Sequence, residues 1–318
     1  MEKPTLLVGE PMGLLIAQEE GAFEDVGAYY VTTCGAEFNV AIGMHRIGHP
    51  VGYYTKLGSD PFGKRIVNTM QAEGISTELI RFSEDRFTGF MLKSKVSKGD
   101  PAIFYFRRNS AASTLSTADI EALDLSSYGA VHMTGITPAI SASAMEATEA
   151  LCARAKAEGM RFTFDPNLRP QLWPDRQTMI DYMNKMAGRS DIFFPGINEA
   201  RILAGTEVPE EIADFYLNRG SGVVVVKLGG RGAYYATALG ERGYVDGYPA
   251  KVVDTVGAGD GFAAGVLTGR LEGLSWEDSV RRGNAVGAIQ VMSLGDNDGL
   301  PTRQELLDFM AGLPDWRK

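Results

Sequence analysis

Hydrophobic and polar positions alternate in long blocks over the second half of the chain. Four short apolar runs are separated by amphipathic stretches that include residues 141–159, the segment after Pro174, and residues 198–204. The apolar runs are residues 130–133, 161–164, 191–194 and 223–226. Such alternation predicts strands joined by crossover helices, and therefore a doubly wound parallel sheet. The unbroken apolar run at residues 223–226 suits a central strand that is buried on both faces.

The two ends of the chain have different patterns. Helical periodicity at the C-terminal end predicts helices over residues 259–271, 276–292 and 303–310. In the first third, we expect helices at residues 35–48 and 61–74 around a strand at residues 51–57. Short strand-like pieces in this third are separated by charged, turn-rich links, and they lie at residues 14–17, 89–92 and 102–106. These pieces predict a small sheet outside the main core, which could act as a lid that excludes water from a cleft.

Composition and charge narrow the class of protein. The chain has 318 residues, 44% of them hydrophobic and 22% charged, which is typical of a globular protein with a large core. The formal net charge of −9 argues against a nucleic-acid or anionic-membrane partner. Cys34 and Cys152 have no ligand spacing, and we find neither a signal-peptide pattern nor a run of about 20 apolar residues. We therefore expect a cytoplasmic protein that does not bind membranes.

The segment from Asp254 to Phe262 carries the strongest chemical signal. Its glycines can let the chain turn sharply, so that backbone N–H groups at a helix start point at a phosphate. Asp260, on the first turn of the predicted helix, would then lie beside a phosphoryl group and could accept the proton of an attacking hydroxyl. An ordinary helix start with a first-turn acid gives the same letters, so the motif alone leaves both interpretations open.

Two further glycine-rich segments are candidate phosphate sites. Residues 58–65 nearly spell a P-loop, but Arg65 stands where that motif needs a hydroxyl for magnesium, so we interpret them as a turn before a helix. Residues 227–232 directly follow a predicted buried strand, at the sheet edge where open α/β folds bind ligands. This placement favours a nucleotide contact by Lys227, Gly229 and Gly232. A simple hairpin turn at the same residues stays an open alternative.

Two arginines follow predicted strands and could hold an anionic substrate. Arg169 comes just after the strand at residues 161–164, and Arg107 ends a predicted lid strand. A guanidinium group matches a carboxylate in geometry, although a surface ion pair is the commoner fate of a single arginine. The three histidines have no acidic or cysteine partners at ligand spacing, which gives hydrolytic triads and zinc sites no support.

Together these segments resemble the ribokinase-like (phosphofructokinase B type) family of carbohydrate kinases over nearly the whole chain. One family signature covers residues 34–41 with Gly48 and residues 58–63, and the other covers residues 254–260. The resemblance implies a three-layer α/β/α sandwich formed by residues 1–318 as a single domain, with a small β-sheet lid within residues 12–33 and 86–109. It also implies that Asp260 is the catalytic base and that the amides of Gly257, Ala258 and Gly259 form an anion hole.

Within this family the chain looks most like 2-keto-3-deoxygluconate kinases. The residues that carry the likeness include Gly9-Glu10-Pro11, residues 104–107, residues 165–169 and residues 295–299. By this resemblance the sugar acid would contact Gly35, Tyr105, Arg107, Arg169 and Asp296. Fructokinases share the Asp-Pro-Asn-x-Arg stretch, so a fructokinase or another neutral-sugar kinase is the alternative.

The chain also departs from the family pattern at two positions. Met91 stands where several of these kinases place an aromatic substrate contact, and Gly196 stands where the wider family has an asparagine near the metal. Glu199 supplies the acid of that motif, and we expect it to reach the metal through water.

The implied cofactors are ATP and Mg²⁺, and some family members also need a monovalent cation near Asp254. Asn284 is assigned to the nucleotide together with the loop at residues 227–232. We expect a homodimer or higher homo-oligomer formed through the lid, because the lid strands have exposed edges and an apolar face. A non-catalytic sugar-binding regulatory protein is an alternative of a different class, which the presence of Asp260 disfavours.

Overall fold

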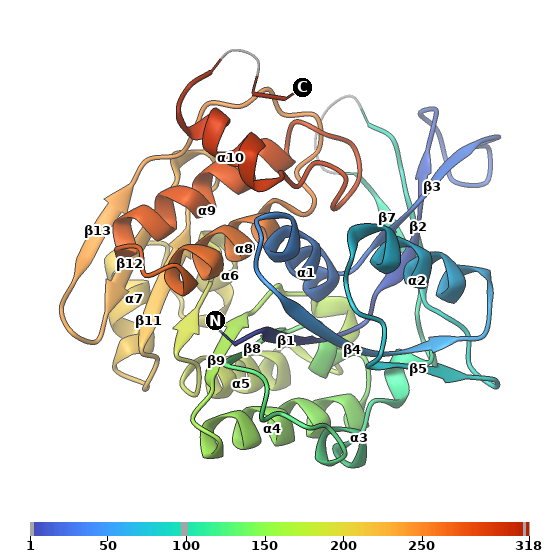
Figure 1. Ribbon diagram of the computed structural model, residues 1–318, viewed down its shortest axis with the longest axis horizontal. Coiled ribbons are helices and arrows are strands. Elements are labelled where there is room, and N and C mark those ends of the chain that lie inside the picture. The colour runs from blue at the N-terminus through green and yellow to red at the C-terminus, as the bar shows by residue number, and fades with distance from the viewer. Residues whose placement is uncertain (1–2, 97–100, 314–315, 318) are drawn as a thin grey trace.

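A large twisted sheet runs through the molecule, with helices on both faces and a smaller sheet at one side (Figure 1). The computed structural model describes residues 3–96, 101–313 and 316–317. The strand order in the large sheet is β13-β12-β11-β10-β9-β8-β1-β4-β5, and only the β11–β12 and β12–β13 pairs are antiparallel. In chain order these strands are β1 (Thr5–Val8), β4 (Val51–Gly58), β5 (Ile80–Ser83), β8 (Ala130–Thr134), β9 (Arg161–Asp165), β10 (Ile192–Phe193), β11 (Val223–Lys227), β12 (Ala233–Thr237) and β13 (Arg242–Val245).

Successive strand residues point to opposite faces, so the sheet carries two hydrophobic cores. Leu6 belongs to one core and Leu7 to the other, and both side chains are fully buried. The first face is covered by α3 (Thr117–Glu121), α4 (Ala142–Ala157), α5 (Arg176–Ala187), α6 (Ile197–Leu203) and α7 (Pro209–Leu217). The second is covered by α1 (Ala36–Arg46), α2 (Pro61–Glu73), α8 (Ala258–Leu271), α9 (Trp276–Gln290) and α10 (Arg303–Met310). The three-layer α/β/α fold expected from the sequence is confirmed.

Close packing of α8 against α9 fixes where α8 begins. A Cβ atom placed on Gly265 would lie only 2.7 Å from the Cα of Gly283 on α9, so the two helices touch through their backbones. Residues of α8 also contact α1, and most of the helix is buried. The N-terminal end of α8 lies beside the ends of β9 and β11: Asn167, just after β9, donates to Asp260, and a Cβ atom on Gly259 would lie 3.5 Å from Nζ of Lys227, the last residue of β11.

The smaller sheet is the predicted lid, with strand order β3-β2-β6-β7. Its strands are β2 (Met12–Ala17), β3 (Tyr29–Cys34), β6 (Phe90–Lys93) and β7 (Ile103–Phe106). Met12, Met91 and Cys34 are buried on the inner face, whereas Phe104 and Phe106 on the outer face are 52% and 40% exposed. The alternation of strand side chains therefore gives the lid one face toward the body and one apolar face, which α2 covers in part, where Phe62 stacks on Phe90, and which is exposed at Phe104.

Several elements were absent from the sequence prediction. The charged, short helices α3 and α7 and the edge strands β5 and β13 have weak apolar patterns, and they take their places from neighbouring elements. The part of the chain that the structure describes contains no helix that is long and apolar enough to cross a membrane.

Candidate active site

Two cavities meet at the start of α8. The first, of about 620 Å³, lies between the inner face of the lid and the carboxyl edge of the large sheet, and the second, of about 470 Å³, lies beside α8 and α9. Both are lined by Lys227, Thr255 and Gly259. The first cavity collects the residues predicted to bind the sugar, and they are Gly35, Tyr105, Arg107, Arg169 and Asp296, together with Asp260, Gly257 and Glu199. The second collects those predicted to bind the nucleotide, which are Gly229, Gly232 and Asn284, together with Ala258.

The turn before α8 requires glycine at one position. Gly257 has a φ of 82°, and a Cβ atom there would lie 2.0 Å from the backbone oxygen of Asp296. Ala258 and Gly259 begin the helix, whose first N–H groups lack partners within the helix and lie at the positive end of its dipole. The geometry is that of an anion site located where the two cavities join.

Asp260 lies on the first turn of α8 and is held by two amide groups. Asn39 Nδ2 donates to Oδ2 at 2.7 Å, and Asn167 Nδ2 donates to Oδ1 at 3.2 Å. Burial raises the pKa of Asp260 to about 8, against the opposing hydrogen bond from Asn39. The two asparagines were not predicted as site residues, although Asn39 lies in the first family signature and Asn167 in the Asp-Pro-Asn stretch. Their position in those motifs was the only available signal.

Arg107 reaches the first cavity from the end of the lid strand β7, but its charge is already balanced. Its Nε donates to Glu10 Oε2 at 2.8 Å, and Ser110 Oγ donates to the other oxygen of Glu10. Glu10 and Arg107 are both buried, and the guanidinium carbon lies 5.5 Å from the centre of the Tyr105 ring. Glu10 therefore fixes the orientation of Arg107 and also neutralises it.

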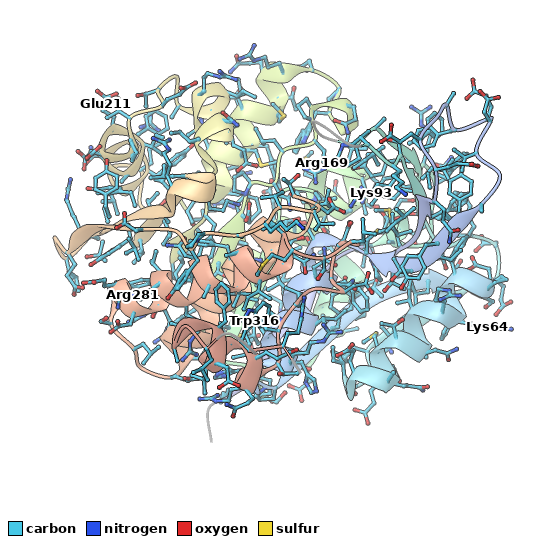
Figure 2. All side chains as sticks on the ribbon, turned by 90° about the horizontal axis from the view of Figure 1, so that it is seen from above. Lys64, Lys93, Arg169, Glu211, Arg281 and Trp316 are labelled. Atoms are coloured by element: carbon cyan, nitrogen blue, oxygen red, sulfur yellow. The ribbon has the colours of Figure 1, made fainter. Side chains whose placement is uncertain are left out.

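Arg169 has a different environment, in the turn after β9. Its Nη1 donates to the backbone oxygen of Leu168 at 2.9 Å, and it makes no ion pair within the described residues. Figure 2 shows Arg169 where the lid meets the main body. Arg169 is thus a cation that is available to a bound anion.

Glu199 supports the turn that carries Arg169. Its Oε1 accepts from the Leu168 amide at 2.8 Å, and its Oε2 accepts from the Gly196 amide at 2.6 Å. A Cβ atom at Gly196 would lie 2.9 Å from Glu199 Oε2, so the glycine allows this close contact. Met91, the other departure from the family pattern, is buried and lines the first cavity.

The loop after β11 is a hairpin turn, and it lies beside the second cavity. It forms the turn of the β11–β12 hairpin, and it also lines the second cavity. Gly232 has a φ of 96°, and Lys227 Nζ lies 2.5 Å from Asp165 Oδ2. Burial raises the pKa of Asp165 to about 6, although Lys227 opposes the rise. Asn284, which lines this cavity, uses Nδ2 to donate to the backbone oxygens of Val245 and Asp246.

Comparisons with known proteins show the family of this chain. The model of the pfkB family of carbohydrate kinases matches residues 6–303. The chain belongs to this family. It is 45% identical to the 2-dehydro-3-deoxygluconokinase of Bacillus subtilis (strain 168), over 98% of this chain and 96% of the relative. It is 31% identical to the 2-dehydro-3-deoxygluconokinase of Thermoproteus tenax, over 96% and 94% of the two chains.

Solved structures of similar fold support the same family. A PfkB protein from Polaromonas sp. JS666 superposes with a TM-score of 0.88 at 42% identity, over 96% of this chain and 99% of that one. A putative ribokinase II from E. coli, solved in complex with ATP and Mg²⁺, superposes with a TM-score of 0.89 at 26% identity, over 98% and 99% of the chains. This pfkB protein is accordingly an enzyme, a carbohydrate kinase.

Proposed function

We propose that this carbohydrate kinase transfers the γ-phosphoryl group of ATP to a hydroxyl of a sugar acid, most specifically 2-keto-3-deoxygluconate. The observation that carries the proposal is the position of Arg169, an arginine without an ion pair among the described residues, in the same cavity as Asp260. A protein of net charge −9 repels an anionic sugar at long range, so it needs a local cation to bind one. The relatives from Bacillus subtilis and Thermoproteus tenax are named as kinases of the same sugar acid.

The proposed chemistry follows from the order of groups along the two cavities. ATP would lie in the second cavity with its phosphates toward the start of α8, and the sugar would lie in the first. The sugar hydroxyl oxygen forms a bond to the γ-phosphorus while the bond to the β–γ bridging oxygen breaks and ADP leaves. Asp260 accepts the hydroxyl proton, and the amides of Gly257, Ala258 and Gly259 receive the negative charge of the transferred group.

Magnesium is the remaining component of this reaction. Within the described residues there is no group of three or more His, Cys, Asp or Glu side chains arranged to hold a metal ion. The described residues therefore fit a magnesium ion that is bound mainly by water and by the nucleotide phosphates, and that contacts Glu199 through a water molecule. Mg²⁺ would neutralise charge on the β and γ phosphates.

A neutral ketose is the second candidate substrate, and one observation favours it. Glu10 already neutralises Arg107, so only one of the two predicted arginines offers an uncompensated charge. A fructokinase would need no such charge.

The test is a comparison of kcat/KM for 2-keto-3-deoxygluconate, its galactose-type epimer, fructose and ribose, with ATP as donor. We expect the sugar acid to be preferred, and we expect Arg169→Ala to raise KM for the acid far more than KM for ATP, because a bidentate guanidinium–carboxylate pair is lost. Arg201→Ala, which removes an exposed arginine that pairs with Glu207 and does not line the first cavity, serves as the matched control. Equal or better turnover of fructose would make the protein a fructokinase, and sugar affinity without turnover would make it a regulatory binding protein.

We also infer that two copies associate through their lids. The exposed rings of Phe104 and Phe106 lie on the outer face of the lid beside the half-buried Leu15 and Leu92, and this apolar face supports the inference. The cytoplasmic location expected from the sequence stays a prediction.

A further inference from the structure

A buried lysine of the lid reaches the loop that precedes the anion site. Lys93, the last residue of β6, has a side chain that is 3% exposed, and its Nζ lies 2.5 Å from Asp254 Oδ2 and 3.0 Å from Asp296 Oδ1. Figure 2 shows Lys93 in the region where the lid meets the body. The sequence pattern gave no sign of this contact, because the three residues lie far apart in the chain.

Both carboxylates that meet Lys93 belong to loops that shape the anion site. Asp254 uses its other oxygen, Oδ1, to accept from the Val256 amide at 3.1 Å, within the turn that leads to Gly257. Asp296 places its backbone oxygen against Gly257, where even a Cβ atom would not fit. Gln290 Nε2 joins the same two loops by donating to Gly295 O at 2.8 Å and Val256 O at 3.4 Å. The charge balance at Lys93 therefore bears directly on the turn that positions the anion-hole amides.

The same geometry bears on the monovalent cation that the family resemblance allows near Asp254. Two buried carboxylates close together repel one another and need a compensating cation. Here the ammonium group of Lys93 already contacts an oxygen of each, so a metal ion bound to those oxygens would meet a like charge at contact distance. The residues present do not fit a monovalent metal ion at this position.

We propose that Lys93 supplies the cation of this site from the lid, so that the enzyme needs no monovalent metal ion and the anion-hole turn is ordered only when the lid is docked. Lys93 is a positioning residue in this proposal, since it acts through Asp254 and Asp296 and not on the substrates. Removal of the ammonium group by Lys93→Ala leaves two buried carboxylates and a space beside them. This space adjoins a further cavity of about 720 Å³ that is also lined by Lys93 and Asp254, through which small cations can enter.

The experiment compares wild type, Lys93→Ala and Lys93→Met in choline chloride with the same proteins in KCl, ammonium chloride or ethylammonium chloride at equal ionic strength. We expect wild-type kcat to be the same in all four salts. In choline chloride, we expect the kcat of Lys93→Ala to fall at least about tenfold. This loss should be smaller than the ~10²–10³ that follows removal of a direct oxyanion donor, because Lys93 does not contact the transferred group. Addition of K⁺ or ethylammonium should restore most of the lost kcat in a saturable way. Lys93→Met fills the space with an apolar chain, so it should lose activity without regaining it.

The activity assay rests on the proposed function, but a second readout, the melting temperature, does not. The melting temperature of Lys93→Ala should rise with KCl relative to choline chloride, whereas that of wild type should not, because only the variant has a vacant cation site. Lys95→Ala is the control. Within the described residues, the Lys95 side chain makes one hydrogen bond, to the Gln18 backbone oxygen, so this variant should behave as wild type. A wild-type requirement for K⁺, or a Lys93→Ala variant whose activity and melting temperature ignore the cation, would overturn the proposal.

Discussion

Most of the buried polar side chains at this site contact a polar partner. Asp260 receives hydrogen bonds from Asn39 and Asn167, and Arg107 is matched by Glu10. Each pair satisfies charges or lone pairs that would otherwise be costly to bury. Arg169 differs because its guanidinium group contacts only backbone oxygens among the described residues, which leaves its charge for a ligand.

The raised pKa of Asp260 leads to a prediction about pH. Burial raises this pKa to about 8, and only the ionised carboxylate can accept the hydroxyl proton, so kcat/KM should rise with pH and level off above about pH 8. Arg169 lowers the pKa of Asp260, so Arg169→Ala should move the rising limb toward higher pH. The measurement is the pH profile of kcat/KM for both proteins. A limb at lower pH in the variant would contradict the assignment of this titration to Asp260.

At the scale of elements, the approach of α8 to α9 fixes the position of the anion site. Gly265→Ala should lower the free energy of unfolding by about 1–3 kcal/mol, because the new methyl group would lie 2.7 Å from the Gly283 Cα and the helices would have to separate. Gly230→Ala is the control, since a Cβ there would have no neighbour within 4 Å and its φ is not in the left-handed region. Urea unfolding of both variants checks this. Equal stability of Gly265→Ala and wild type would mean that the backbone contact is not tight.

The sequence predicted the elements with strong periodicity and the motif residues, and it missed contacts between distant segments. The apolar run of β11 and the helices α8 and α9 were foreseen because local hydrophobic patterns specify them. The pairing of Lys93 with Asp254 and Asp296 depends on the docking of the lid, which no local pattern encodes. For the same reason the sequence does not predict the neutralisation of Arg107 by Glu10, although both residues belong to the motifs that carry the family resemblance.

For the molecule as a whole, the lid takes part in both the proposed catalysis and the proposed association of two copies. Its inner face lines the substrate cavity, and its outer face exposes Phe104 and Phe106. Phe104→Asp should convert a dimer into monomers, because an added charge would have to be buried at the lid interface. Light scattering of wild type and variant gives the two masses. Phe82→Asp, which alters an exposed ring on β5 outside the lid sheet, is the control. A monomeric wild type at working concentration would contradict the association.

The most direct test of the account is the turnover of Asp260→Asn, because the account makes Asp260 the group that accepts the substrate proton. Asparagine keeps the shape of the side chain and removes its basicity, so kcat should fall by about 10²–10⁴ while the Kd for ATP changes little. Unchanged circular dichroism and melting temperature would exclude a folding defect as the cause. Near-normal turnover of the folded Asp260→Asn variant with 2-keto-3-deoxygluconate would contradict the account.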